Sequence, residues 1–562
     1  WRMIPLDEST TGGAPVARGR ARLLLCACAA LALLLGGVRF GDESYVSLQG
    51  DMPRHLMNGV FFRDALYDLP FGSIGEAAEY ARYYYARYPA LSIGHHPFLI
   101  ALAEAPLYAV FGVSVTTARV VSLTFFVIGV LYLYKLVSEL FDPWAGAAAA
   151  AVYASSAQLV DLAQAVMTET SALALLVVAA YYSHRFAVTG RSRAIVMATL
   201  LAAGSVWAKQ LAVVALPGLV VHVWWRVGWR RLLRADVVGA TLLSAVVVAP
   251  LVPITLMLSP FNVGHAVGAA MSINQAGRLA YTAGLLGEAF RMHFSWPVLA
   301  LSAAGFVLLL VRRPALALTV LVWVASTLVF VGVVGNQDAV RYSIYWIPPL
   351  ALCFGALASR AVGPRSVVVG VLLLVAIATQ VAASSTIRQA GAHGYEEAAE
   401  YVVANPRGST VMFAGDVDTG FFTFFVRKHD SARAAIVIRA DKVLTTSMMD
   451  KVAAEDRISD PAQIADIVRR FGVGYVVVED RPSASKVQNW LLDDLKSARY
   501  VERLRVPTGS TDPRLRNISV VVYEVSGATS AAADARLEIK LPLVSQQIDI
   551  SLSDLIARKY LR

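Results

Sequence analysis

The chain contains repeated apolar runs that are long enough to cross a lipid bilayer as helices. A helix needs roughly 20 apolar residues to span a hydrocarbon core of about 30 Å. Only 16% of the 562 residues are charged, against about 25% in a typical soluble domain. We therefore expect a polytopic α-helical membrane protein. The eleven predicted spans lie near residues 20–39, 118–140, 146–166, 170–187, 193–208, 210–226, 235–258, 296–311, 314–334, 343–360 and 366–386.

The stretch 97–112 is also apolar, but it is short and contains Glu104 and Pro106. We expect a surface or re-entrant helix there. With eleven spans and a cytoplasmic N-terminus, every basic cluster falls on the cytoplasmic side, as the positive-inside rule requires. The net charge of +10 therefore reports topology and indicates no nucleic-acid partner. The clusters comprise Arg18, Arg20, Arg22, Arg185, Arg191, Arg193, Arg226, Arg230, Arg231, Arg234, Arg312, Arg313, Arg360 and Arg365.

This topology divides the chain into a membrane part and a tail on the outer face. We expect a transmembrane domain over 1–387, with a long outer loop, 40–117, that contains juxtamembrane helices. From Gly394 onward, short β-rich runs alternate with helical patterns, which predicts an extracytoplasmic α/β domain over 388–526. The sequence assigns no role to the C-terminal tail, 527–562.

Three acidic residues lie at the outer ends of predicted spans, where ionisable groups are costly and usually functional. Asp42 and Glu43 follow the first span directly, and Glu169 occupies a very short outer turn. Each also has a plainer interpretation. Asp42 and Glu43 would form a polar helix end in water, and Glu169 would stabilise the N-terminus of the next helix.

Lys209 and Arg341 lie on the outer face, against the positive-inside pattern. Cations placed there need a local anion, which is either a carboxylate partner or a lipid-linked phosphate. His95 and His96 begin the 97–112 helix, and they either face the same site or are ordinary interface histidines. We predict no metal site, because two histidines alone provide too few ligands.

Taken in order along the chain, these residues resemble the GT-C glycosyltransferases. The resemblance is closest to the family of the bacterial aminoarabinose–lipid A transferase and the protein O-mannosyltransferases (glycosyltransferase family 39-like), and it covers roughly 20–360. Two features depart from the family pattern: Glu169 stands where Asp is usual, and His95 or His96 where the aminoarabinose enzymes usually have Lys. The motifs that carry the resemblance are GDESYVSLQGDM, GHHPFLIALAEAPLYAVFG, TTARVVSL, MTETSAL, AKQLAVVALP and VRYSIYWIPPL.

The resemblance implies an inverting glycosyltransferase in the plasma (inner) membrane. It would move a sugar from a polyprenyl-phosphate donor to a hydroxyl of a protein, lipid or glycan acceptor on the extracytoplasmic face. Asp42 would act as the base, with Glu43 as its neighbour, and Glu169 would orient the acceptor or share the base role. The residues expected to bind the donor phosphate are Lys209, Arg341, His95, His96, Tyr342 and Arg119.

Fixed cations can neutralise a phosphate, so we expect no required cofactor. Some relatives use a divalent ion, and this point stays open. The alternative to a transferase is a multi-pass transporter or a sugar-lipid binding protein. A transporter is expected to have broken helices at the midplane and two similar halves. We find neither matching Gly/Pro-broken segments nor an internal repeat.

Overall fold

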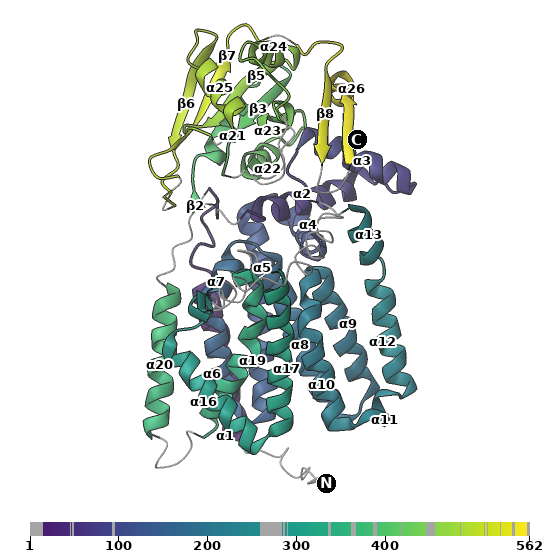
Figure 1. Cartoon of the computed structure of the whole chain (residues 1–562), viewed down its shortest axis with the longest axis vertical. Helices are drawn as coiled ribbons and strands as arrows, with labels where there is room; N and C mark the ends of the chain where they lie inside the picture. Colours follow the sequence, from purple (N-terminus) through teal and green to yellow (C-terminus); the bar gives the residue numbers. More distant parts are fainter. Residues whose placement is uncertain are drawn as a thin grey trace.

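The computed structural model describes residues 15–258, 284–334, 339–360, 367–385, 391–445 and 456–558, apart from short gaps inside these ranges. A bundle of apolar helices bears a smaller domain of strands and helices at one end (Figure 1). Three helices lie between the two parts: α2 (Met52–Asp68), α3 (Ile74–Arg87) and α4 (Leu99–Phe111).

The helices of the bundle follow the predicted apolar runs. Within the described residues, six helices are long and apolar enough to cross a membrane. These six are α1 (Pro15–Gly36), α5 (Val115–Leu140), α8 (Thr168–Thr189), η2 (Gln210–Ala215) with α10 (Leu216–Val227), α12 (Ala235–Val248) with α13 (Leu251–Leu258), and α20 (Val367–Ser385). The other helices of the bundle are α6 (Pro143–Ala154), α7 (Ala157–Gln164), α9 (Ser192–Ala208), α11 (Trp229–Leu232), α16 (Trp296–Arg312), α17 (Pro314–Val334), α18 (Ala339–Tyr342), η3 (Ser343–Trp346) and α19 (Ile347–Ala358). The polytopic helical fold is confirmed, and the count of eleven spans stays a prediction.

One predicted span, 146–166, is interrupted in the structure. The chain leaves the helix at Ser155 and Ser156, which separate α6 from α7. The Ser155 carbonyl, freed from the helical pattern, accepts a hydrogen bond of 3.0 Å from Gln380 Nε2 on α20. A polar side chain from a neighbouring helix thus provides the hydrogen bond that the carbonyl lost at the break. An interrupted helix at membrane depth requires such a partner.

The domain at the end of the bundle is built on a five-stranded mixed sheet. Its strand order is β4-β3-β5-β7-β6, with β3 parallel to β4 and β5, and β7 antiparallel to β5 and β6. The strands are β3 (Thr410–Ala414), β4 (Val437–Arg439), β5 (Val473–Glu479), β6 (Tyr500–Pro507) and β7 (Ser519–Val525). The helices of this part are α21 (Tyr395–Ala404), α22 (Thr419–His429), α23 (Ala440–Val443), α24 (Gln463–Arg470) and α25 (Lys486–Asp494). The α/β organisation expected for 388–526 is therefore present.

The last part of the chain, which the sequence left without a role, folds with this domain. Strands β8 (Arg536–Leu541) and β9 (Gln546–Ser551) form an antiparallel hairpin, and α26 (Leu552–Ala557) follows. Leu537, Ile548 and Leu555 are buried in the same apolar core as the sheet. The Leu555 carbonyl also accepts a hydrogen bond from Arg87 on α3. The hairpin and α26 therefore help to fasten the domain to the juxtamembrane helices.

The outer loop and the domain are joined a second time by a short β-pair. Strand β1 (Val46–Ser47) pairs antiparallel with β2 (Gly391–Ala392). Since β1 lies between α1 and α2, this pair holds the start of the outer loop against the segment that leaves the last bundle helix.

Helices α2 and α4 approach closely and trap a carboxyl group between them. Gly59 permits the approach, because a Cβ there would meet Tyr108 Cε2 at 2.8 Å. Glu104 is fully buried, and neither of its carboxyl oxygens has a hydrogen-bond partner within the described structure. Burial raises the pKa of Glu104 well above its usual value, so the group is held in its neutral form.

We predict that Glu104→Met raises the free energy of unfolding by about 1–3 kcal/mol, since it removes a buried polar group without partners. The unfolded carboxyl ionises near pH 4.5 while the folded one stays protonated. Wild-type stability should therefore decline as the pH rises above about 4.5, and Glu104→Met should lack this component. Thermal unfolding in detergent between pH 5 and 8 measures both effects. Glu400→Met, at an exposed position, is the control, and an equal gain in that variant would contradict the argument.

Candidate active site

Four charged side chains from distant parts of the chain meet where the bundle adjoins the juxtamembrane helices. The Arg341 guanidinium lies between two acids: its Nη2 donates to Asp51 Oδ2 at 2.7 Å, and its Nε donates to Glu169 Oε1. Lys209 Nζ donates to the same Glu169 oxygen. Glu169 is 1% exposed, whereas Lys209, Arg341 and Asp51 are 12–16% exposed. The two cations therefore neutralise a buried acid and keep limited access to solvent.

Asp51 is placed by the start of α2. It is the N-cap residue of that helix, and Pro53 within the first turn favours the helix start. An N-cap aspartate normally accepts backbone N–H groups of its own helix, but the Asp51 side chain makes no such bond. Its carboxylate instead contacts Arg341 and, at 3.3 Å, His96 Nε2. The residue has the position of a cap, and its carboxylate points into the charged cluster.

Glu169 and Lys209 are positioned by interruptions between helices. Glu169 lies in the first turn of α8, and the turn before it holds Val166 at φ 52°. A β-branched residue in this left-handed region is strained by about 1–3 kcal/mol and persists only where the surroundings enforce it. Lys209 is the extended residue between α9 and η2. Its Nζ lies 5.5 Å from the centre of the Tyr342 ring, which adds a cation–π contact.

Two histidines and a further arginine surround Asp51. Arg54 Nη1 lies 3.2 Å from Asp51 Oδ1, and the rings of His55 and His96 have centroids 5.1 Å apart. Burial alone would raise the pKa of the Asp51 carboxyl, but the charges of His96, Arg341 and Arg54 outweigh it and hold that pKa well below its usual value. Burial, reinforced by the charge of His96, lowers the pKa of His55 to about 3. Asp51 is thus ionised and His55 neutral at physiological pH.

Of the predicted site residues, Glu169, Lys209, Arg341, His96 and Tyr342 are brought together by these contacts. Asp42 and Glu43 have other described contacts. Glu43 accepts hydrogen bonds from the backbone N–H groups of Val115 and Thr116, at 3.0 and 2.7 Å, and its carboxylate lies 3.0 Å from Lys428 Nζ. This carboxylate therefore stabilises the N-terminus of α5 and ties it to the α/β domain.

Arg119 and Asp42 lie together at the end of α1. The Arg119 guanidinium donates to the backbone carbonyls of Arg39 and Asp42, both at 2.7 Å, and to that of Gln164 at 3.2 Å. These bonds brace the turn that follows α1 against α5 and α7. His95, predicted beside His96, lies outside the described residues.

Asp51, Arg54 and His55 were not among the residues predicted for the site. Asp51 begins the segment DMPRH, and an acid before a helix-starting Pro is a recognisable N-cap signal. His55 follows at i+4 from Asp51, which places both residues on one side of the helix start.

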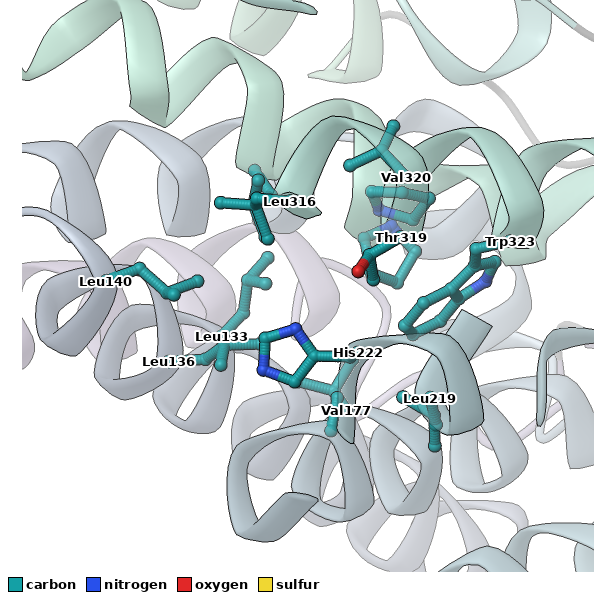
Figure 2. A pocket seen from close by; sticks show the side chains of 14 residues that line it. Leu133, Leu136, Leu140, Val177, Leu219, His222, Leu316, Thr319, Val320 and Trp323 are labelled. Carbon is teal, nitrogen blue, oxygen red and sulfur yellow. The ribbon is translucent and has the colours of Figure 1, made fainter. Parts of the chain in front are cut away.

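A cavity inside the bundle lies apart from the charged cluster. It is lined mainly by apolar side chains of α5, α8, α10, α17 and α19, among them Leu133, Leu219 and Trp323 (Figure 2). Its polar members are His222 and Thr319, and His222 Nε2 lies 3.3 Å from His184 Nδ1. An apolar chamber of this kind suits a hydrocarbon chain better than it suits acid–base chemistry. The charged cluster around Arg341 is therefore the candidate active site.

The chemistry available at the cluster follows from its charges. Lys209 and Arg341 are cationic donors of the kind that bind phosphate, and both donate to Glu169. Asp51 is an ionised carboxylate within the same group and is able to accept a proton. The arrangement suits displacement of a phosphate leaving group by a hydroxyl nucleophile.

The chain shares its fold with solved membrane proteins of the GT-C type. The chain is similar to ArnT from Cupriavidus metallidurans in the apo state, with a TM-score of 0.57 and 13% identity over 92% of this chain and 100% of ArnT. The same protein bound to undecaprenyl phosphate matches with a TM-score of 0.50 and 12% identity over the same shares of the two chains. The expected GT-C fold is thus confirmed.

Two further comparisons agree with this fold. The apo oligosaccharyltransferase of Archaeoglobus fulgidus matches with a TM-score of 0.51 and 12% identity, covering 89% of this chain and 76% of that enzyme. Residues 95–255 match the profile of the dolichyl-phosphate-mannose-protein mannosyltransferase family. No curated protein matches the chain at a significant level by sequence.

Proposed function

We propose that the chain is an inverting glycosyltransferase that moves a sugar from a polyprenyl-phosphate donor to an acceptor hydroxyl. The observation that carries the proposal is the cluster in which Arg341 and Lys209 share the buried Glu169 beside the ionised Asp51. A purely structural ion pair would need only one cation for Glu169, and that cation would not need access to solvent. The undecaprenyl phosphate bound to ArnT supports a donor of this class.

In the proposed mechanism, the donor phosphate binds Arg341 and Lys209, with His96 and Tyr342 at its edge. Asp51, rather than Asp42, accepts the proton of the acceptor hydroxyl as that oxygen attacks the anomeric carbon. The sugar–phosphate bond breaks with inversion, and the polyprenyl phosphate leaves with the bonding electrons. Glu169 positions the two cations. The fixed positive charges stabilise the leaving phosphate, so this mechanism requires no cofactor.

We also propose that the end of the bundle bearing the α/β domain faces the extracytoplasmic side of the inner membrane. The arginine-rich turn at α11 lies at the opposite end of the bundle (Figure 1), which the positive-inside rule places in the cytoplasm. The acceptor is then a protein, lipid or glycan outside the cytoplasm. The α/β domain, docked over the site, is the part of the chain best placed to receive it.

A panel of radiolabelled polyprenyl-phosphate sugars, offered to purified protein with membrane extract as acceptor, tests the function. We expect label transfer from one donor, and at least a hundredfold lower transfer efficiency for Arg341→Gln, because the phosphate loses its bidentate partner. Thermal unfolding checks that the variant is folded. Absence of transfer from every donor with folded wild-type protein would favour the transporter or the sugar-lipid binding protein.

A further inference from the structure

We infer that a cluster of arginines at the end of the bundle remote from the α/β domain binds the headgroup of an anionic phospholipid. Two turns contribute to this surface: the turn between α8 and α9, and the turn that contains α11. The position of α11 shows that the surface lies far from the α/β domain (Figure 1). The arginine cluster comprises Arg191, Arg193, Arg226, Arg230, Arg231 and Arg234.

The two turns are held side by side by contacts between them. Ser192 Oγ, in the first turn, donates to Asp236 Oδ2 in the second at 2.6 Å. The Arg231 guanidinium lies against Gly190, where a Cβ would meet Arg231 Nη2 at 2.7 Å. Gly190 ends α8 at φ 67°, a conformation that favours glycine. The charges of the two turns therefore belong to one surface.

Most of the positive charge in the arginine cluster is not neutralised by the protein. All six arginines are exposed, and among the ion pairs of the described residues only Arg234 has an acidic partner, Asp236, at 3.1 Å. Other arginines nearby are used within the fold: Arg185 pairs with Glu139, and Arg313 donates to a backbone carbonyl. Like charges gathered on one surface repel each other. An anion from outside the protein would relieve this repulsion.

The apolar side chains beside the arginines indicate that this anion belongs to a lipid. Trp224, Trp225 and Trp229 are 40%, 51% and 64% exposed, and Leu233 is 61% exposed. Tryptophan is enriched where a membrane protein meets the headgroups, and basic residues directly beside a membrane-spanning helix attract anionic lipids. A soluble phosphate or a nucleic acid would engage the arginines and leave the indole rings in water. A phospholipid engages both.

The site is separate from the charged cluster around Arg341, and lipid binding does not depend on whether the chain transfers a sugar. The positive-inside rule explains on which side of the membrane these arginines lie. It does not require that they stay without acidic partners beside exposed tryptophans. The lipid site therefore goes beyond the topology that the same arginines report.

Native mass spectrometry of the full chain tests the site. Protein purified in detergent and freed of bound lipid is titrated with phosphatidylglycerol or, separately, with phosphatidylcholine, and the bound lipids are counted. We expect the wild type to bind phosphatidylglycerol about tenfold more tightly, because each arginine near the headgroup adds to the attraction. The double variant Arg230→Gln with Arg231→Gln should lose this preference and bind phosphatidylcholine like the wild type.

The double variant Arg312→Gln with Arg360→Gln is the matched control, because it removes the same charge from exposed positions at the ends of α16 and α19. It should keep the preference for phosphatidylglycerol. Arg191→Gln with Arg193→Gln, in the other turn, should lose it, and this variant keeps the test decisive if the first one does not fold. Equal binding of the two lipids by the wild type, or equal losses in the control and in both cluster variants, would overturn the inference.

Two further conditions distinguish a lipid from a soluble anion. Raising the ionic strength from about 0.1 M to about 1 M should weaken phosphatidylglycerol binding, because the Debye length falls from about 10 Å to about 3 Å. Glycerol 1-phosphate, which has the phosphate without the acyl chains, should displace little lipid at equal concentration. Displacement of half the lipid by glycerol 1-phosphate under these conditions would assign the cluster to a soluble phosphate and contradict the inference.

Discussion

Replacing Asp51 by asparagine is expected to lower the turnover of sugar transfer by about 10²–10⁴-fold, the range attributed to a general base. Asparagine keeps the size of the side chain and an oxygen for Arg341, so the cluster should stay assembled. It cannot take a proton from the acceptor. Initial rates at saturating polyprenyl-phosphate sugar measure the effect, and thermal unfolding checks the fold.

Asp42→Asn is the comparison that decides which acid is the base. The Asp42 backbone carbonyl accepts a hydrogen bond from Arg119, and the variant retains this bond. We therefore expect Asp42→Asn to keep most of its turnover. If it loses as much activity as Asp51→Asn while remaining folded, the base role returns to Asp42 and the geometry around Arg341 needs another explanation.

The helices of this protein could be predicted from the sequence because their causes are local. A run of about 20 apolar residues spans a bilayer as a helix whatever lies elsewhere in the chain. Alternation of short β-rich runs with helical patterns likewise predicted the α/β domain. The break between α6 and α7 was missed, since it depends on Gln380, which lies 225 residues away from the Ser155 carbonyl that it satisfies.

Part of the candidate site was also predictable. Lys209 and Arg341 stood out because they oppose the charge rule for membrane topology, and Glu169 because it lies in a very short outer turn. The carboxylate proposed as an alternative partner for the two cations is present, and it is Glu169. What the sequence did not show is that Arg341 joins Glu169 to an acid 290 residues away along the chain, Asp51.

The docking of the α/β domain was beyond prediction for the same reason. Arg427 on α22 lies 363 residues from Asp64 on α2, yet the two form a bidentate ion pair with N–O distances of 2.7–2.9 Å. Asp64 is fully buried and also accepts a hydrogen bond from Tyr84 at 2.7 Å. No local pattern pairs such residues. The pair matters to the site because α2, which it holds, begins at Asp51.

Arg427→Met is therefore expected to lower the free energy of unfolding by about 3–5 kcal/mol, because it leaves the Asp64 charge buried without its main partner. The double variant Asp64→Leu with Arg427→Met should recover much of this loss, since it removes the unpaired charge as well. Thermal unfolding and protease sensitivity of the α/β domain measure the effect. Arg505→Met, which breaks exposed ion pairs with Glu502 and Asp480, is the control and should cost no more than about 1 kcal/mol. A loss in Arg427→Met as small as that of the control would mean that apolar packing, rather than this ion pair, holds the α/β domain over α2.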